Sequence, residues 1–164
     1  MPLVDLPEED EMAAAVARID AWAQRELAAE DGFLVAAERQ EVTDRTASFR
    51  WYLRFKGEEK DFITVWFTLK QRTLHYEAQF MPAPETNIEA TWQYLLTRNA
   101  DLIGLSFALG AEDAVYLVGR VPVSRVDDDE LDRIAGSSVL YTDEHFPTAM
   151  TIAHPSTYRR RPRR

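Results

Sequence analysis

The stretch that decides the fold is FRWYLRFKGEEKDFITVWFTLKQRTLHYEAQF, at residues 49–80. In its first part, large apolar residues alternate with Arg50, Tyr52 and Arg54. A period of two places these two sets on opposite faces of a β-strand. The same alternation returns twice, and the polar connections at 57–60 and 71–72 are too short for a crossover helix. The stretch therefore predicts three consecutive antiparallel strands.

The residues before this stretch predict an amphipathic helix. Apolar residues recur at three- and four-residue steps between positions 12 and 27. Asp5 and Pro7 are typical of a helix start, and Asp31-Gly32 is typical of a helix end. Residues 33–40 fit either a strand or an irregular connector.

The residues after this stretch predict a helix, two strands and a further helix. Pro82 and Pro84 end the sheet, and Thr86 with Glu89 forms a capping-box pattern for a helix at 86–99. An apolar stripe is expected to turn that helix toward the core; it comprises Ile88, Trp92, Leu95, Leu96 and Leu102. Alternating runs between 105 and 121 predict two strands, and the acids at 127–130 predict the start of a last helix, which runs to 152.

The order helix, three strands, helix, two strands, helix is typical of an α+β fold. We expect an antiparallel five-stranded sheet with helices packed on one face. Residues 5–152 are predicted to form a single domain, and residues 153–164 a disordered, arginine-rich tail.

Composition narrows the classes of function. The 164 residues hold 28 acidic and 19 basic side chains, a net charge of −9, and the last six residues hold five arginines. An acidic body repels polyanions, so nucleic acid is an unlikely partner except weakly, through the tail. The acids near the start and the short apolar runs argue against a signal peptide or a membrane partner. The absence of cysteine excludes disulfides and fits a cytoplasmic protein.

Five segments resemble one known family. They are RFKGEEKDFITVW (54–66), QRTLHYE (71–77), FMPAPE (80–85), EDAVYLVG (112–119) and DELDRI (129–134). Together they resemble the actinobacterial branch of the YbjN-type domain family, which is labelled as bacterial sensory transduction regulators. The resemblance implies a fold similar to type III secretion chaperones, which usually dimerise and hold segments of partner proteins. It implies no known catalytic residues.

The outward face of the predicted sheet is the first candidate site. If the apolar set of the first strand packs under the helices, the opposite face carries Arg50, Tyr52, Arg54, Phe62, Trp66 and Glu77. Exposed aromatic clusters of this kind often mark interaction surfaces, although ordinary cross-strand pairing explains them equally well. The preferred hypothesis is a non-enzymatic protein, a homodimer, that buries apolar side chains of a partner protein while Arg50 and Arg54 orient the partner's acids.

Two further sets of residues are candidates. Tyr94 and Arg98 lie one turn apart on the predicted helix at 86–99 and are expected to form the dimer interface. His75 and Glu77 share one strand face, and with Arg54 they would form the polar groups of a small-molecule sensor or enzyme, the alternative hypothesis.

No cofactor or metal is expected. The chain has three histidines, His75, His145 and His154, in none of the usual metal-binding motifs. Its six glycines form no phosphate-binding loop.

Overall fold

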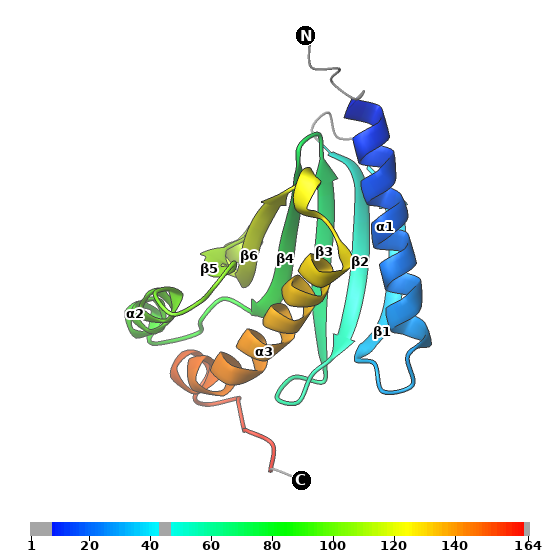
Figure 1. The fold of residues 1–164 in the computed structure, drawn as a ribbon. Coiled ribbons are helices and arrows are strands. Elements are labelled where there is room, and N and C mark those ends of the chain that lie inside the picture. Colours follow the sequence, from blue (N-terminus) through cyan, green and yellow to red (C-terminus); the bar gives the residue numbers. More distant parts are fainter. Residues whose placement is uncertain (1–7, 43–46, 163–164) are drawn as a thin grey trace.

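One antiparallel sheet of six strands organises the chain, with the strand order β1-β2-β3-β4-β6-β5 (Figure 1). The structure is a computed structural model and describes residues 8–42 and 47–162. The helices are α1 (Glu8–Ala28), α2 (Ile88–Asn99) and α3 (Asp128–Ala153), and the short 3₁₀ turns are η1 (Ala111–Asp113) and η2 (Val123–Arg125). The strands are β1 (Leu34–Glu41), β2 (Ala47–Lys56), β3 (Phe62–Lys70), β4 (Thr73–Met81), β5 (Ser106–Leu109) and β6 (Val115–Pro122).

The predicted three-strand meander is confirmed. Strands β2, β3 and β4 pair antiparallel in sequence order, and Trp66 lies opposite Tyr52 on one side and Glu77 on the other. Because paired residues share a face, the alternation of each strand lines up across the whole sheet. The fold class, α+β with helices on one face, is likewise confirmed.

The predicted number of five strands is wrong, because residues 34–41 form a sixth. Strand β1 pairs with β2 along its length, after an irregularity in register between Leu34 and Ala36. It is an edge strand rich in small and charged residues, so its alternation of apolar and polar side chains is weak. The hydrogen-bonded pairing with β2, whose alternation of apolar and polar residues is strong, holds β1 in the extended conformation.

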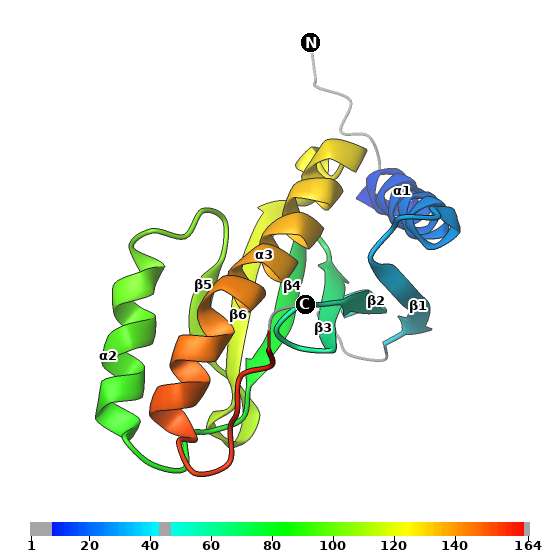
Figure 2. The same cartoon turned by 90° about the horizontal axis from the view of Figure 1, so that it is seen from below.

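Helices α1 and α3 cover one face of the sheet, while α2 lies beside β5 (Figures 1 and 2). The covered face supplies fully buried residues such as Trp51, Phe67 and Leu117, and α3 supplies Leu131 and Ile134. The Phe67 ring also stacks on Trp22 of α1, with ring centroids 6.0 Å apart. This apolar layer is the hydrophobic core of the domain.

Two indole groups fix α1 to its neighbours. The Nε1–H of Trp51 in β2 donates to Asp20 of α1 at 2.9 Å, and the Nε1–H of Trp22 in α1 donates to Asp132 of α3 at 2.9 Å. Arg39 of β1 also pairs with Asp20 at 2.5 Å. Each buried indole therefore has a hydrogen-bond partner, as burial of a polar group requires.

The predicted capping box at Thr86 is wrong. Helix α2 starts at Ile88, and its N-cap is Asn87, in the left-handed conformation with φ 52° and without a capping side-chain bond. The Asn87 amide instead donates to the Ile152 carbonyl at 3.0 Å, and the Thr86 N–H donates to the Ala153 carbonyl at 3.2 Å. The Thr86 N–H, which the capping box would offer to the Glu89 carboxylate, therefore bonds to the end of α3 instead.

The start of α3 matches its prediction, because the Asp127 side chain accepts from the Glu130 N–H at 2.8 Å. The predicted helix start at Asp5 and Pro7 lies outside the described residues, as do Arg163 and Arg164. Ala153, the first residue of the predicted tail, ends α3, and the described residues that follow return toward the turn between β2 and β3 (Figure 2).

Candidate partner-binding surface

The sheet face opposite α1 and α3 carries the six residues expected to bind a partner. We call it the open face; it comprises Arg50, Tyr52, Arg54, Phe62, Thr64, Trp66, Thr68, His75, Glu77, Tyr116 and Val118. Phe62 is 43% exposed, and Tyr52 and Trp66 are half-buried. The covering helices lie on the other side of the sheet (Figure 1). The aromatic rings predicted to face outward do so.

A row of rings crosses the middle of the open face. Tyr52 and Trp66 are register partners with ring centroids 6.2 Å apart, and Tyr116 of β6 lies 6.4 Å beyond Trp66. Tilted contacts at these distances are the geometry that aromatic pairs favour. The row joins rings of β2, β3 and β6, and the polar side chains of Glu77 and Gln79 on β4 lie beside it.

Two arginines lie on rings of the same face. The Arg50 guanidinium carbon sits 5.5 Å from the Trp66 ring centroid, and that of Arg54 sits 3.8 Å from the Phe62 centroid. Both contacts are cation–π interactions. The open face therefore combines apolar rings with positive charge.

A depression of about 590 Å³ lies at the Arg54 end of the open face. Tyr52, Arg54 and Phe62 line it from the sheet, and Lys60 lines it from the turn after β2. The Lys60 ammonium donates to the carbonyls of Gln79 and Phe80, both at 3.0 Å. Burial lowers the pKa of Lys60 to about 8, although the negative charge of Asp143 opposes this shift.

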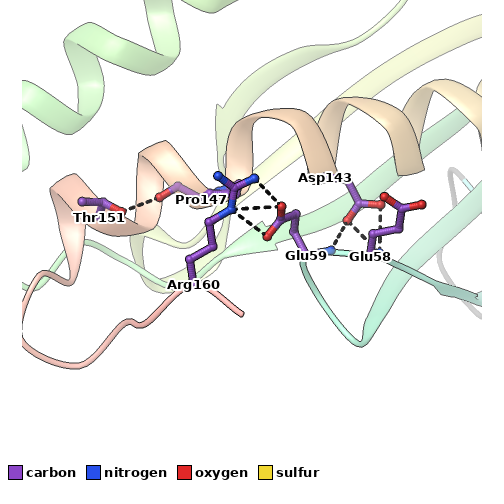
Figure 3. A network of polar contacts seen from close by, with 6 residues as sticks. All are labelled: Glu58, Glu59, Asp143, Pro147, Thr151 and Arg160. Atoms are coloured by element: carbon purple, nitrogen blue, oxygen red, sulfur yellow. Dashed lines mark hydrogen bonds and ion pairs between the residues drawn. The ribbon is translucent and has the colours of Figure 1, made fainter. Parts of the chain in front are cut away.

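The turn beside this depression is held by α3 and by the tail (Figure 3). Asp143 of α3 accepts from the backbone N–H groups of Glu58, at 3.1 Å, and Glu59, at 2.9 Å. Arg160 pairs with Glu59 at 2.6 Å, and Arg161 pairs with Asp61 at 2.6 Å. Acids of the chain itself thus neutralise two arginines of the tail, the segment through which only weak nucleic-acid binding is expected.

A second depression, of about 370 Å³, includes His75 and Glu77 together with Arg120 and Ser106. Burial, with the positive charges of Lys70 and Arg120, lowers the pKa of His75, and Glu77 acts in the opposite direction.

Arg54 does not join this second depression. It pairs with Thr64, whereas His75 pairs with Thr68, four residues further along β3. At roughly 3.3 Å per residue this offset alone is about 13 Å. The three polar groups of the alternative hypothesis are therefore not assembled in one place.

Comparisons with known proteins identify the family. The YbjN family, described as "Putative bacterial sensory transduction regulator", matches residues 16–149. The chain belongs to the YbjN family.

Relatives of this YbjN domain occur in mycobacteria. Uncharacterized proteins of Mycobacterium bovis and Mycobacterium tuberculosis are each 31% identical over 104 residues, and one of Mycobacterium leprae is 29% identical over 108 residues. The first two alignments cover 63% of this chain, and the third covers 66%. The aligned part spans only 57% to 59% of the relatives' own length.

A solved structure also matches the domain. It is a chain of the heterodimeric complex ExoU–SpcU from the type III secretion system of Pseudomonas aeruginosa, at 12% identity. The match covers 84% of this chain and 99% of the other, with a TM-score of 0.45.

None of the helices in the described part of the YbjN domain has the length and apolar character needed to cross a membrane.

The predicted dimer contacts of the YbjN domain pack within one copy. The Tyr94 hydroxyl lies 3.2 Å from Nδ1 of His145 in α3, and the Arg98 guanidinium lies 5.6 Å from the Tyr94 ring centroid. The dimer interface at Tyr94 and Arg98 stays a prediction. The predicted inward stripe of α2 is partly wrong, since Thr91 and Leu95 are the buried residues. Ile88 and Leu96 are 52% and 67% exposed.

The sequence prediction of the site missed the residues of β6. Tyr116 extends the ring row, and Arg120 is the register partner of His75. Their signal was the period-two pattern of β6, which places Tyr116, Val118 and Arg120 on one face. Only the pairing of β6 with β4, across the intervening helix, brings that face beside His75 and Glu77.

Proposed function

We propose that this YbjN domain is a non-enzymatic regulatory module that binds an extended segment of a partner protein on the open face. The observation that carries the proposal is the uncovered row of Tyr52, Trp66 and Tyr116 beside the exposed Phe62 ring. Binding would bury apolar side chains of the partner, and Arg50 and Arg54 would orient its acids. Large aromatic residues and arginine are the side chains that most often dominate binding energy.

Binding is favoured over catalysis because of the sheet register. The hypothesis of a sensor or enzyme needs His75, Glu77 and Arg54 together, and Arg54 lies at the other end of the open face. A location in the cytoplasm stays a prediction from the cysteine-free sequence.

The test uses a displayed library of random twelve-residue peptides selected against the wild-type protein. The affinities of the selected peptides are then measured by fluorescence polarisation for the wild type and for the double variant Tyr52→Ser, Trp66→Ser. We expect affinity to fall by about ten-fold or more, since loss of an aromatic anchor typically costs over 1 kcal/mol. Circular dichroism confirms that each variant is folded.

The matched control is Ile103→Ser, which removes a 74% exposed apolar side chain away from the open face. It should leave the affinities unchanged. Peptides that bind the double variant as tightly as the wild type would show that the open face is not the binding surface.

We also propose that two copies associate through α2. Ile88, Trp92 and Leu96 recur every four residues and form one stripe along the helix. Trp92 and Leu96 line a shallow depression of about 610 Å³ together with Glu89, Gln93 and Thr97. An antiparallel pair of α2 helices would set Ile88 of one copy against Leu96 of the other, so the stripe is self-complementary.

The association is measured by analytical ultracentrifugation over a range of concentrations. Leu96→Glu should shift the protein to monomer, because it places a charge in the apolar stripe. Leu140→Glu is the matched control, since Leu140 is similarly exposed, at 61%, but lies on α3. Equal masses for wild type and Leu96→Glu would contradict association through α2.

A further inference from the structure

Arg50 and Arg54, the two arginines that β2 places on the open face, differ from five other arginines of the chain in their partners. Within residues 8–42 and 47–162, no ion pair joins Arg50 or Arg54 to a carboxylate. Arginines elsewhere do form such pairs: Arg25 with Asp128, Arg39 with Asp20, Arg133 with Glu130, Arg160 with Glu59, and Arg161 with Asp61. In a chain with 28 acids and 19 bases, acids are abundant enough to pair with every base. Arg50 and Arg54 are nevertheless among the described arginines that form no such pair, so their positive charges stay available on the open face.

The contacts of these arginines leave hydrogen-bond donors available. A guanidinium that rests on an aromatic ring uses its flat face, and its N–H groups stay in the plane, where they match a carboxylate. Arg54 lies on Phe62 and Arg50 near Trp66 in this way. The Arg50 Nε is also buried without a hydrogen-bond partner in the chain. Both side chains are thus held in place and retain free donors.

Neighbouring acids form no ion pair with Arg50 or Arg54 among the described residues: Glu59 and Asp61, which line the depression beside Arg54, pair with Arg160 and Arg161. On the flanking strands, Glu38 is the register partner of Tyr52 and Glu77 that of Trp66, so both lie level with the rings. The register partners of Arg50 are Gln40 and Thr68, and those of Arg54 are Ala36 and Thr64. Uncharged residues therefore flank each guanidinium along the sheet.

The spacing of the two arginines suggests what binds there. Arg50 and Arg54 are four residues apart on β2, or about 13 Å at roughly 3.3 Å per residue. Tyr52 and its partner Trp66 lie midway between them. In an extended ligand, side chains at positions i, i+2 and i+4 point to the same side with the same spacing.

We propose that the open face binds an extended acidic segment in which two carboxylates four residues apart flank an apolar residue. The carboxylates pair with Arg50 and Arg54, and the apolar side chain lies on Tyr52 and Trp66. This inference rests on the proposed function and specifies the chemistry of the partner. Arginine with carboxylate forms the two-pronged hydrogen-bonded pair that gives both charge and geometric selectivity.

The experiment measures binding of fluorescein-labelled peptides. The test peptide is Gly-Ser-Ser-Asp-Ser-Leu-Ser-Asp-Ser-Ser-Gly. One comparison peptide replaces both aspartates by asparagine, and another moves the second aspartate one position closer to the first. Affinity for both comparison peptides should be at least about ten-fold weaker, because charge pairs and their register are lost. The affinity of the test peptide should also fall as salt concentration rises.

A charge exchange tests the two arginines directly. The double variant Arg50→Glu, Arg54→Glu should no longer bind the aspartate peptide. It should instead bind a peptide that has lysine in place of both aspartates. Arg125→Glu reverses an exposed charge on η2, outside the open face, and should bind the aspartate peptide as the wild type does. Recovery by exchanged charges cannot arise from a folding defect.

Two results overturn the inference. One is equal affinity of the wild type for the aspartate, asparagine and shifted peptides, or no binding of the aspartate peptide. The other is a set of library-selected peptides whose binding depends on Trp66 but not on Arg50, Arg54 or any acid of the peptide. The second result would leave the proposed function intact and reject the acidic segment, so the two failures are distinguishable.

Discussion

The two faces of the sheet are built from alternate residues of the same strands, yet they differ in what covers them. Phe67 and Trp66 are neighbours on β3, and Phe67 is fully buried whereas Trp66 is half-buried. Phe67 packs against Trp22 of α1, whereas the ring contacts of Trp66 are with residues of its own sheet, Tyr52, Tyr116 and Arg50. The strand conformation is the same for both residues, so the helix layer makes the difference.

This difference separates stability from binding. Full burial of a large apolar side chain removes it from water and contributes strongly to folding. A ring that is only half-buried contributes less to folding and retains apolar surface that a partner can still cover. The covered face therefore holds the domain together, and the open face is the one available for binding.

The largest expected effect compares these two neighbours. Phe67→Ala should lower the free energy of unfolding by about 3–5 kcal/mol, because it leaves a cavity in the core. Trp66→Ala should lower it by only about 1–2 kcal/mol, because the site is open to water and the lost contacts are cross-strand pairs. Urea unfolding followed by circular dichroism measures both values. Equal losses would show that the open face is as much part of the core as the covered face.

The next effect concerns Lys60, at the edge where the two faces meet. Its pKa is 10.5 in the unfolded chain and about 8 in the folded protein. Between these two pH values the unfolded chain binds more protons, so the contribution of Lys60 to stability rises as pH increases from 8 to 10.5. The shift corresponds to up to about 3 kcal/mol.

Lys60→Met isolates this effect, because every other titrating group is kept. The unfolding free energy of the wild type, relative to that of Lys60→Met, should rise as pH increases from 8 to 10.5. Lys56→Met, at an exposed lysine near the end of β2, should show no such change. A difference that is constant with pH would indicate that the Lys60 ammonium is not buried against the Gln79 and Phe80 carbonyls.

The smallest effect tests the coupling of rings on the open face. A double-mutant cycle with Tyr52→Ala and Trp66→Ala should give a coupling free energy of about 0.2–1 kcal/mol, the range of cross-strand pairs. Leu53 and Val65 form a register pair one position along on the covered face, and they offer a matched cycle within the core. A coupling free energy near zero would show that the Tyr52 and Trp66 rings do not stabilise each other.

Residues with strong local patterns were predicted correctly. The alternation from Phe49 to Phe80 was sufficient to place three strands and to assign Tyr52, Phe62 and Trp66 to the uncovered face. The acids at 127–130 likewise predicted where α3 begins, and Asp127 is its N-cap. These features depend on neighbours in the sequence, which is why they could be read from it.

Features that depend on distant residues were missed. Strand β1 forms against β2 despite its weak pattern, and Thr86 and Asn87 bond to Ala153 and Ile152 at the end of α3 instead of capping α2 with their side chains. The predicted grouping of Arg54 with His75 failed for the same reason, since only the strand register sets their separation. Tyr116 and Arg120 joined the site through the pairing of β6 with β4.

The sequence by itself determined which side chains of each strand share a face, because backbone geometry alternates side chains whatever lies around them. It also determined that one face would be apolar throughout and the other mixed. The tertiary structure decided which face the helices cover, which strands lie side by side, and hence that Arg50 and Arg54 rest on rings rather than on acids. Those outcomes depend on packing between segments far apart in the chain, and no local pattern encodes such distances.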